Sequence, residues 1–383
     1  MTEGRSPRHG ERIVDLRRLL TMTQAELAQK TGIPQPNLSN LERGKHELTA
    51  SMAFRIGQAT GTPLDFFGYE SPSYSSDDIN FRKSSRVSAK GRDFVVQAFK
   101  EIERMSNSLA YAPARLKSID LPVAEELDIV EESDVELLAQ DARDALGLKR
   151  DEPVRNVIRA IERAGVAVAP IPAPSEDNLS LLDGHCGLSR WSNGAPRATI
   201  AFIAGQSGDR QRFTVAHELG HALCHAQRTV PADRREVEAN LFAGAFLLPK
   251  DVALQNLSET LTLHGFMRVK AQYGISIQAA IARGRRLGVI SPQRQKSLMI
   301  QISSRGWRKN EPISVGPENP IRLWTELVAM YGPNPYFGAS KDLGLPPGLL
   351  KQWIPSRDTS PMKTKSSGGS EVISLAGRSR KGR

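Results

Sequence analysis

The residues of this 383-residue sequence that are best suited to chemistry stand together in the stretch RFTVAHELGHALCH, at positions 212–225. His217 and His221 are four residues apart, so on an α-helix they project from the same side and can both reach one metal ion. Glu218 is offset by about 100° from His217 and can lie beside an open coordination position. This arrangement is typical of a zinc site whose glutamate acts as general base. The motif therefore predicts a hydrolytic zinc centre with Glu218 as its proton acceptor.

A catalytic zinc ion needs a third protein ligand and a position left open for water. The following stretch RREVEANLFAGAFLLP, at 234–249, offers Glu236 and Glu238. We expect Glu236 to be the third ligand, because Asn240 lies one helical turn later on the same face, where its side chain would hydrogen-bond to the carboxylate and orient it toward the metal. Glu238 stays open as the alternative ligand.

Two more side chains of the motif stretch allow more than one interpretation. His225 lies one turn beyond His221, where it either approaches the site or makes a cap or core contact at the helix end. Cys224 could bind metal or be oxidised, but we expect it to behave as a small buried hydrophobic residue.

The first 68 residues predict a different chemistry. Helices are expected at 23–30 and 35–43, joined by the short turn TGIP, with Thr23 as an N-cap and Gly32 in the turn. Such a pair has the geometry of a helix-turn-helix, whose first helix crosses the DNA backbone while the second enters the major groove. A small helical bundle that binds protein is the alternative.

The stretch TQAELAQKTGIPQPNLSNLERGK, followed by FRIGQATGTPLDFF, resembles the Cro/repressor-type (XRE) family of helix-turn-helix proteins. The resemblance implies a set of DNA-facing residues: Gln24 on phosphate; Gln35, Pro36, Asn37 and Asn40 toward bases; Arg43 and Lys45 near the backbone. Residues 1–68 carry nine Lys or Arg against seven Asp or Glu, so the module is only mildly basic. Tight binding to an operator in double-stranded DNA would therefore need a homodimer.

A second resemblance covers about 135–312. RQRFTVAHELGHALCH followed by EVEANLFAGAFLLP resembles the ImmA/IrrE family of metallopeptidase-like proteins, and is similar to gluzincin-type sites in which a downstream glutamate completes HExxH. The resemblance implies that His217, His221 and Glu236 hold Zn²⁺ and that Glu218 is the general base.

The expected fold is mainly α-helical with a small mixed β-sheet, to which VAVAPI and RATIAFIAG contribute strands. It combines the helix-turn-helix bundle with an α+β, zincin-like domain and a basic helical C-terminal part. The expected divisions of the chain are a helix-turn-helix domain at 11–68, a linker and helical connector at 69–134, a metallopeptidase-like domain at 135–312 with a basic helical subdomain at 250–312, a helical segment at 313–355, and a disordered basic tail at 356–383.

Composition and charge limit the classes of function. The net charge of +10 favours an anionic partner such as nucleic acid. Residues 268–309 hold ten Lys or Arg and no acid, whereas 118–141 hold nine acids and no base. The two stretches are either solvated faces that oppose each other, or the basic one contacts DNA or an acidic partner. The start of the chain lacks the apolar stretch of a signal peptide, no apolar run could span a membrane, and there are only two cysteines, so a cytoplasmic protein without a membrane partner is expected.

These features together predict a DNA-binding transcriptional regulator with a zinc endopeptidase domain. Relatives in the resembled family are often linked to repressors, which implies cleavage of a repressor-like or antitoxin-like regulatory protein, or of the chain itself. The alternative is a transcription factor whose metallopeptidase-like domain is a non-catalytic sensor or dimerisation unit.

Overall fold

The computed structural model describes residues 10–71, 74, 80–81, 88–114, 118–126, 129, 131–191 and 195–357. Parts of the expected linker and helical connector at 69–134, and nearly all of the expected basic tail at 356–383, lie outside these residues. None of the described helices is both long enough and apolar enough to cross a membrane.

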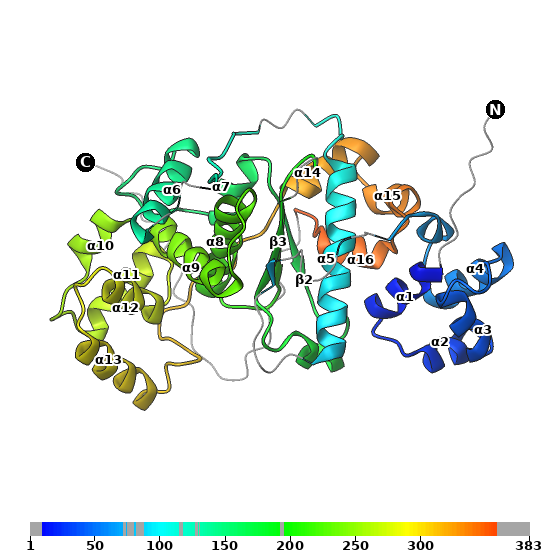
Figure 1. Ribbon diagram of the computed structural model, residues 1–383, viewed down its shortest axis with the longest axis horizontal. Helices are drawn as coiled ribbons and strands as arrows, with labels where there is room; N and C mark the ends of the chain where they lie inside the picture. The colour runs from blue at the N-terminus through cyan, green and yellow to red at the C-terminus, as the bar shows by residue number, and fades with distance from the viewer. Residues whose placement is uncertain are drawn as a thin grey trace, which may run out of the picture.

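A four-stranded mixed sheet forms the middle layer of the molecule, in the order β1-β3-β4-β2 (Figure 1). Its strands are β1 (Asn80–Phe81), β2 (Ala167–Ile171), β3 (Gly187–Arg190) and β4 (Thr199–Ile203). β2 runs parallel to β4, whereas β3 is antiparallel to β4 and β1 is antiparallel to β3. Successive side chains of a strand point to opposite faces. Accordingly, Ile200 joins one apolar core and Ala201 joins the other.

The motif helix α8 (Gly208–His225) and its neighbour α9 (Ala232–Leu247) lie on one side of the sheet. Gly220, inside the motif, allows their close approach, because a Cβ atom there would lie 3.0 Å from Cβ of Phe242. The same side holds α6 (Glu132–Ala145), α7 (Val157–Arg163), α10 (Lys250–Asn256), α11 (Leu263–Tyr273), α12 (Ile277–Arg286) and α13 (Pro292–Ser304).

The other face of the sheet packs against the long helix α5 (Ala89–Leu109) and the C-terminal helices. The elements on this side are the 3₁₀ helix η3 (Glu176–Leu182), α14 (Arg322–Tyr331), α15 (Pro335–Leu343) and α16 (Pro347–Trp353). Their buried apolar side chains form one continuous core with those of the N-terminal helices. The expected fold, mainly helical with a small mixed sheet, is confirmed.

The N-terminal helices form the expected bundle at one end of the molecule (Figure 1). They are α1 (Gly10–Leu19), α2 (Gln24–Thr31), α3 (Gln35–Glu42), α4 (Ala50–Thr60) and the 3₁₀ helix η1 (Leu64–Gly68). Thr23 begins α2 with a capping box shared with Glu26, as its position in the sequence indicated. The buried Arg12 of α1 donates hydrogen bonds to Glu101 of α5 and to the carbonyl oxygen of Phe66. A buried ion pair thus ties the bundle to α5.

The basic and acidic stretches meet in the fold. The guanidinium of Arg283 in α12 donates to both carboxylate oxygens of Glu136 in α6, and Arg286 lies 4.0 Å from Glu132. Part of the basic charge at 268–309 is therefore compensated within the chain.

The bounds of two helices are set by side-chain caps. Helix α7 begins at Val157, because the Asn156 side chain caps it there. Helix α5 begins at Ala89, capped by Ser88. Strand β3 was not expected, since GLSR is too short and too polar to show a strand pattern.

Candidate metal centre

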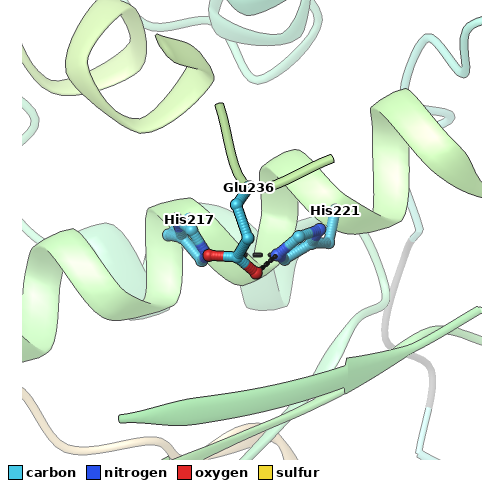
Figure 2. A group of neighbouring side chains, drawn as sticks. All are labelled: His217, His221 and Glu236. Carbon is cyan, nitrogen blue, oxygen red and sulfur yellow. Dashed lines mark hydrogen bonds and ion pairs between the residues drawn. The ribbon is translucent and has the colours of Figure 1, made fainter. Parts of the chain in front are cut away.

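The two motif histidines lie one helical turn apart on α8 and point toward the same space (Figure 2). Their Nε2 atoms are 3.0 Å apart, and both side chains are 2% exposed. The helix forms because apolar residues surround the histidines on its other faces, among them Val215, Leu219 and Leu223, which are fully buried. Two imidazole nitrogens of largely buried side chains are therefore held close together.

Glu236 reaches this pair of nitrogens from α9 (Figure 2). Its carboxylate oxygens lie 3.3 Å from Nε2 of His221 and 3.7 Å from Nε2 of His217. A tetrahedral zinc ion with ligand bonds of 2.0–2.1 Å holds its ligand atoms about 3.3 Å from one another. The three ligand atoms lie within 4.8 Å of one another, and two imidazoles with one carboxylate are a donor set that zinc prefers. The residues fit a metal ion.

Glu238 does not face the pair of histidine nitrogens. It accepts hydrogen bonds from Arg228 and Arg234, and one of its oxygens lies 3.1 Å from Nε2 of His225. Although burial alone would raise it, the pKa of Glu238 is lowered, since both arginines donate to the carboxylate. Of the two glutamates considered from the sequence, the structure brings Glu236 to the histidines and directs Glu238 elsewhere.

His225 connects Glu238 to the candidate metal centre. Its Nδ1 lies 3.1 Å from Nδ1 of His221, on the side of that ring opposite Glu236. Burial, together with the neighbouring His221, lowers the pKa of His225 to about 3, so its ring is neutral at neutral pH. A neutral ring that donates a hydrogen bond to Glu238 through Nε2–H can accept a hydrogen bond from Nδ1–H of His221. That arrangement leaves Nε2 of His221 free of a proton and directed at the metal position.

Glu218 lies on the sheet side of α8, beside β3. The Ser189 hydroxyl donates a 2.7 Å hydrogen bond to Oε2 of Glu218. Gly187 passes so close to the helix that a Cβ there would lie 2.8 Å from Oε1 of Glu218. A glycine and a serine in alternate positions of one strand thus make room for the expected base and hold it.

The two remaining residues considered at the motif have structural contacts. Asn240 donates a 2.7 Å hydrogen bond to the main-chain carbonyl oxygen of Glu236, not to its carboxylate. Cys224 is fully buried in the core, and burial raises the pKa of its thiol well above the usual value. It lies outside the cluster of candidate metal ligands.

At the opposite end of the molecule, most of the expected DNA-facing residues, on α3 and directly after it, are exposed to solvent. Those with exposed side chains are Gln35, Pro36, Asn37, Arg43 and Lys45, whereas Asn40 and Gln24 are half-buried. The Gln24 amide donates to Glu42, and Gln35 donates to Gln24 at 3.4 Å. These contacts join the start of α2 to α3, as the two helices of such a pair require.

Comparison with known families agrees with both halves of this description. Residues 161–284 match the Peptidase_M78 family, described as the IrrE N-terminal-like domain, and residues 13–67 match the family described as Helix-turn-helix. The fold and the histidine-glutamate cluster thus define a metallopeptidase-like domain that shares its chain with a helix-turn-helix domain. The chain is a fusion of an XRE-type helix-turn-helix with an IrrE-like domain. Comparison with curated proteins found no match.

Sequence reasoning did not identify Ser189 as part of the site, and it considered His225 and Glu238 separately without predicting the contact between them. Ser189 belongs to a strand without a readable pattern, 29 residues before Glu218. His225 carried one signal, its four-residue spacing from His221, which places both on one helix face.

Proposed function

We propose that the chain is a DNA-binding regulator whose second domain is a zinc-dependent endopeptidase that cleaves a regulatory protein or the chain itself. The observation that carries the proposal is the meeting of His217, His221 and Glu236, with ligand atoms within 4.8 Å of one another. A buried glutamate, Glu218, follows the first of these histidines and is held by Ser189.

Each side chain of the site has a separate role in the proposed hydrolysis of a peptide bond. His217, His221 and Glu236 would hold Zn²⁺, which when bound acts as a Lewis acid and makes water acidic enough to lose a proton near neutral pH. Glu218 would act as the general base that accepts a proton from the attacking water, and then as the acid that delivers this proton to the leaving amine. Ser189 donates to one oxygen of Glu218 and so restricts the orientation of its carboxylate.

The helix-turn-helix would bring this chemistry to DNA. Amide side chains such as Asn37 on the exposed face of α3 can read adenine, and Arg43 can hold phosphate or guanine. Because the module is only mildly basic, specific binding would require a homodimer that contacts two half-sites. A regulatory protein bound at the same promoter would then be presented to the peptidase domain at a high effective concentration.

One contact supports the chain itself as a substrate. β1, which lies between the two domains in the sequence, pairs antiparallel with β3, so that Asn80 stands opposite Ser189. An extended peptide added to a sheet edge is a common way to hold a substrate backbone. The backbone of β1 occupies this edge next to the residue that holds Glu218.

The replacement Glu218→Gln tests the proposal, because the amide keeps the size of the side chain but cannot accept the proton. We expect the purified variant to retain zinc and to leave the regulated genes unresponsive to their inducing condition. Asn37→Ala serves as the matched control in the other domain, since it should weaken operator binding and leave hydrolysis intact.

An unchanged regulatory output from a zinc-loaded Glu218→Gln chain would contradict peptidase action. It would support instead a metallopeptidase-like domain that acts as a sensor or a dimerisation unit. Failure of the wild-type chain to bind zinc at all would exclude both metal-dependent roles.

A further inference from the structure

Two hollows lie on either side of Phe213, next to the candidate metal centre. The first measures about 650 Å³ and is lined by α8, the start of α12 and the segment that follows α13. The second measures about 600 Å³ and is lined by α9, α12 and Gln295 of α13. Both include Phe213 and Ala279, so they form two halves of one groove.

The groove adjoins the ligands on both of the helices that carry them. Phe213 precedes His217 by one helical turn, and the centres of their rings are 6.5 Å apart. Asn240 lines the second hollow and follows Glu236 by one turn on α9. A peptide whose scissile bond reached the metal position would therefore place its neighbouring side chains in this groove.

The groove carries uncompensated positive charge. Its lining includes Arg210, Arg308 and Lys309 in the first hollow and Arg285 in the second. These four cations form no ion pair with a carboxylate within the part of the chain that the structure describes. Two of them donate hydrogen bonds to side chains of another kind, Arg210 to Cys186 and Arg308 to Ser303.

The carboxylates that line the groove are already in an ion pair. Asp209 and Glu311 both lie within 3.1 Å of the buried Lys270 ammonium, and Arg283 is paired with Glu136 outside the groove. Five of the ten basic residues of 268–309 thus fall into two groups. Lys270 and Arg283 hold the fold together, whereas Arg285, Arg308 and Lys309 face the groove.

The shape of the groove and its position in the molecule favour a peptide over duplex DNA as its ligand. The cations line hollows between helices with a half-buried aromatic ring, Phe213, at their junction, and a pocket of this kind suits side chains. The helix expected to enter DNA, α3, lies at the opposite end of the molecule from α12 and α13 (Figure 1).

We propose that this groove selects substrates with acidic residues beside the scissile bond, held by Arg210, Arg285, Arg308 and Lys309. The inference rests on the proposed peptidase function and names its substrate class. The four cations act as specificity-determining residues, because they attract and orient the segments that flank the reacting bond.

Binding to the full-length, zinc-loaded Glu218→Gln chain tests the inference without requiring hydrolysis. Fluorescence anisotropy compares a labelled peptide of alternating Glu and Ala with a matched peptide of alternating Gln and Ala. We expect roughly tenfold tighter binding of the acidic peptide, with the difference shrinking at high salt. The double variant Arg285→Glu with Lys309→Glu should lose the preference. The matched control Arg268→Glu, an exposed residue outside both hollows, should keep it.

Equal affinity for the two peptides, or a preference that survives the double charge reversal, would overturn the inference. A third outcome would also overturn it. If a short DNA duplex without the operator bound the wild-type chain and Asn37→Ala but not the double variant, the groove would be a nucleic-acid site. Retained zinc content and an unchanged unfolding temperature show that the double variant is folded. Absence of hydrolysis by the wild-type chain would contradict the proposed function and leave this binding result as it stands.

Discussion

The Nδ1 atoms of His221 and His225 lie 3.1 Å apart, one helical turn from each other on α8. On its other side, Nε2 of His225 lies 3.1 Å from Oε2 of Glu238, which Arg228 and Arg234 hold in place. The chain of contacts begins at a buried carboxylate and ends at a candidate metal ligand. His225 is thus a positioning residue that sets the orientation and proton of the His221 ring.

Replacing His225 by Ala should lower the affinity for zinc by about 10–100-fold, the usual effect of removing a partner that orients a ligand. Competition with a chelating dye measures this affinity. The matched control is His264→Ala, because His264 is exposed on α11. Equal zinc affinity in the His225→Ala chain and the wild type would show that the ring contact is only structural.

Glu236→Ala and Glu238→Ala should fail in different ways. Glu236→Ala removes a ligand, so it should lower the affinity for zinc by more than His225→Ala does, for which about 10–100-fold is expected. The metal-free protein should stay folded. Glu238→Ala leaves the buried Arg228 without its carboxylate and should lower the free energy of unfolding by about 1–3 kcal/mol.

Zinc titration and chemical denaturation of both variants, each compared with wild type, separate these effects. If Glu238→Ala abolished zinc binding in a folded chain while Glu236→Ala retained it, the assignment of the third ligand would be reversed.

Ser189→Ala should lower the rate of peptide hydrolysis about tenfold, the lower end for a hydrogen bond to a charged group, because Glu218 loses the donor that fixes its carboxylate. Zinc content should stay at the wild-type level, since Ser189 does not touch the ligands. Ser189→Thr, which keeps the hydroxyl, is the conservative comparison. A rate for Ser189→Ala equal to the wild-type rate would remove β3 from the catalytic arrangement.

The local parts of the site follow from the sequence, because helical spacing alone places His217, Glu218 and His221. The choice of Glu236 agrees with the cluster that the structure assembles, but the reason given for it was incomplete. Asn240 was expected to orient the carboxylate, yet its amide donates to the main-chain carbonyl oxygen of Glu236. The backbone of α9 is supported there, and its packing against α8 brings Glu236 to the histidines.

The contacts that the sequence does not reveal are those set by distant packing. Ser189 reaches Glu218 because a short, polar strand crosses beneath α8, and four residues carry no periodicity from which to predict it. The attachment of the N-terminal bundle is similar, since Arg12 and Glu101 are 89 residues apart. A charged residue in an amphipathic helix is expected at the surface, so its burial in an ion pair is visible only in three dimensions.

Stability should depend on pH through Glu162, a buried residue at the end of α7. Burial raises the pKa of Glu162 to about 7, although the main-chain N–H groups of Ile321 and Arg322 donate to its carboxylate. The folded state therefore binds the proton more tightly than the unfolded state does. The resulting stability is fully present below about pH 4.5 and is lost as pH rises through 7.

Glu162→Gln mimics the protonated side chain and keeps an oxygen acceptor for both N–H groups. The difference in free energy of unfolding, variant minus wild type, should therefore increase by about 3 kcal/mol from pH 5 to pH 8, because only the wild type loses stability over this range. Urea denaturation across this range measures the difference. A difference between variant and wild type that stays constant with pH would contradict the assigned cause.

The most direct test of the central claim is a quantitative comparison of newly formed protein N-termini in cells that make the wild-type chain or Glu218→Gln at equal abundance. Peptidase action predicts at least one new N-terminus, in a DNA-binding regulator or in the chain itself, that is present with the wild type and absent with the variant. Identical sets of N-termini from the two chains under the inducing condition, with zinc bound to both, would contradict it.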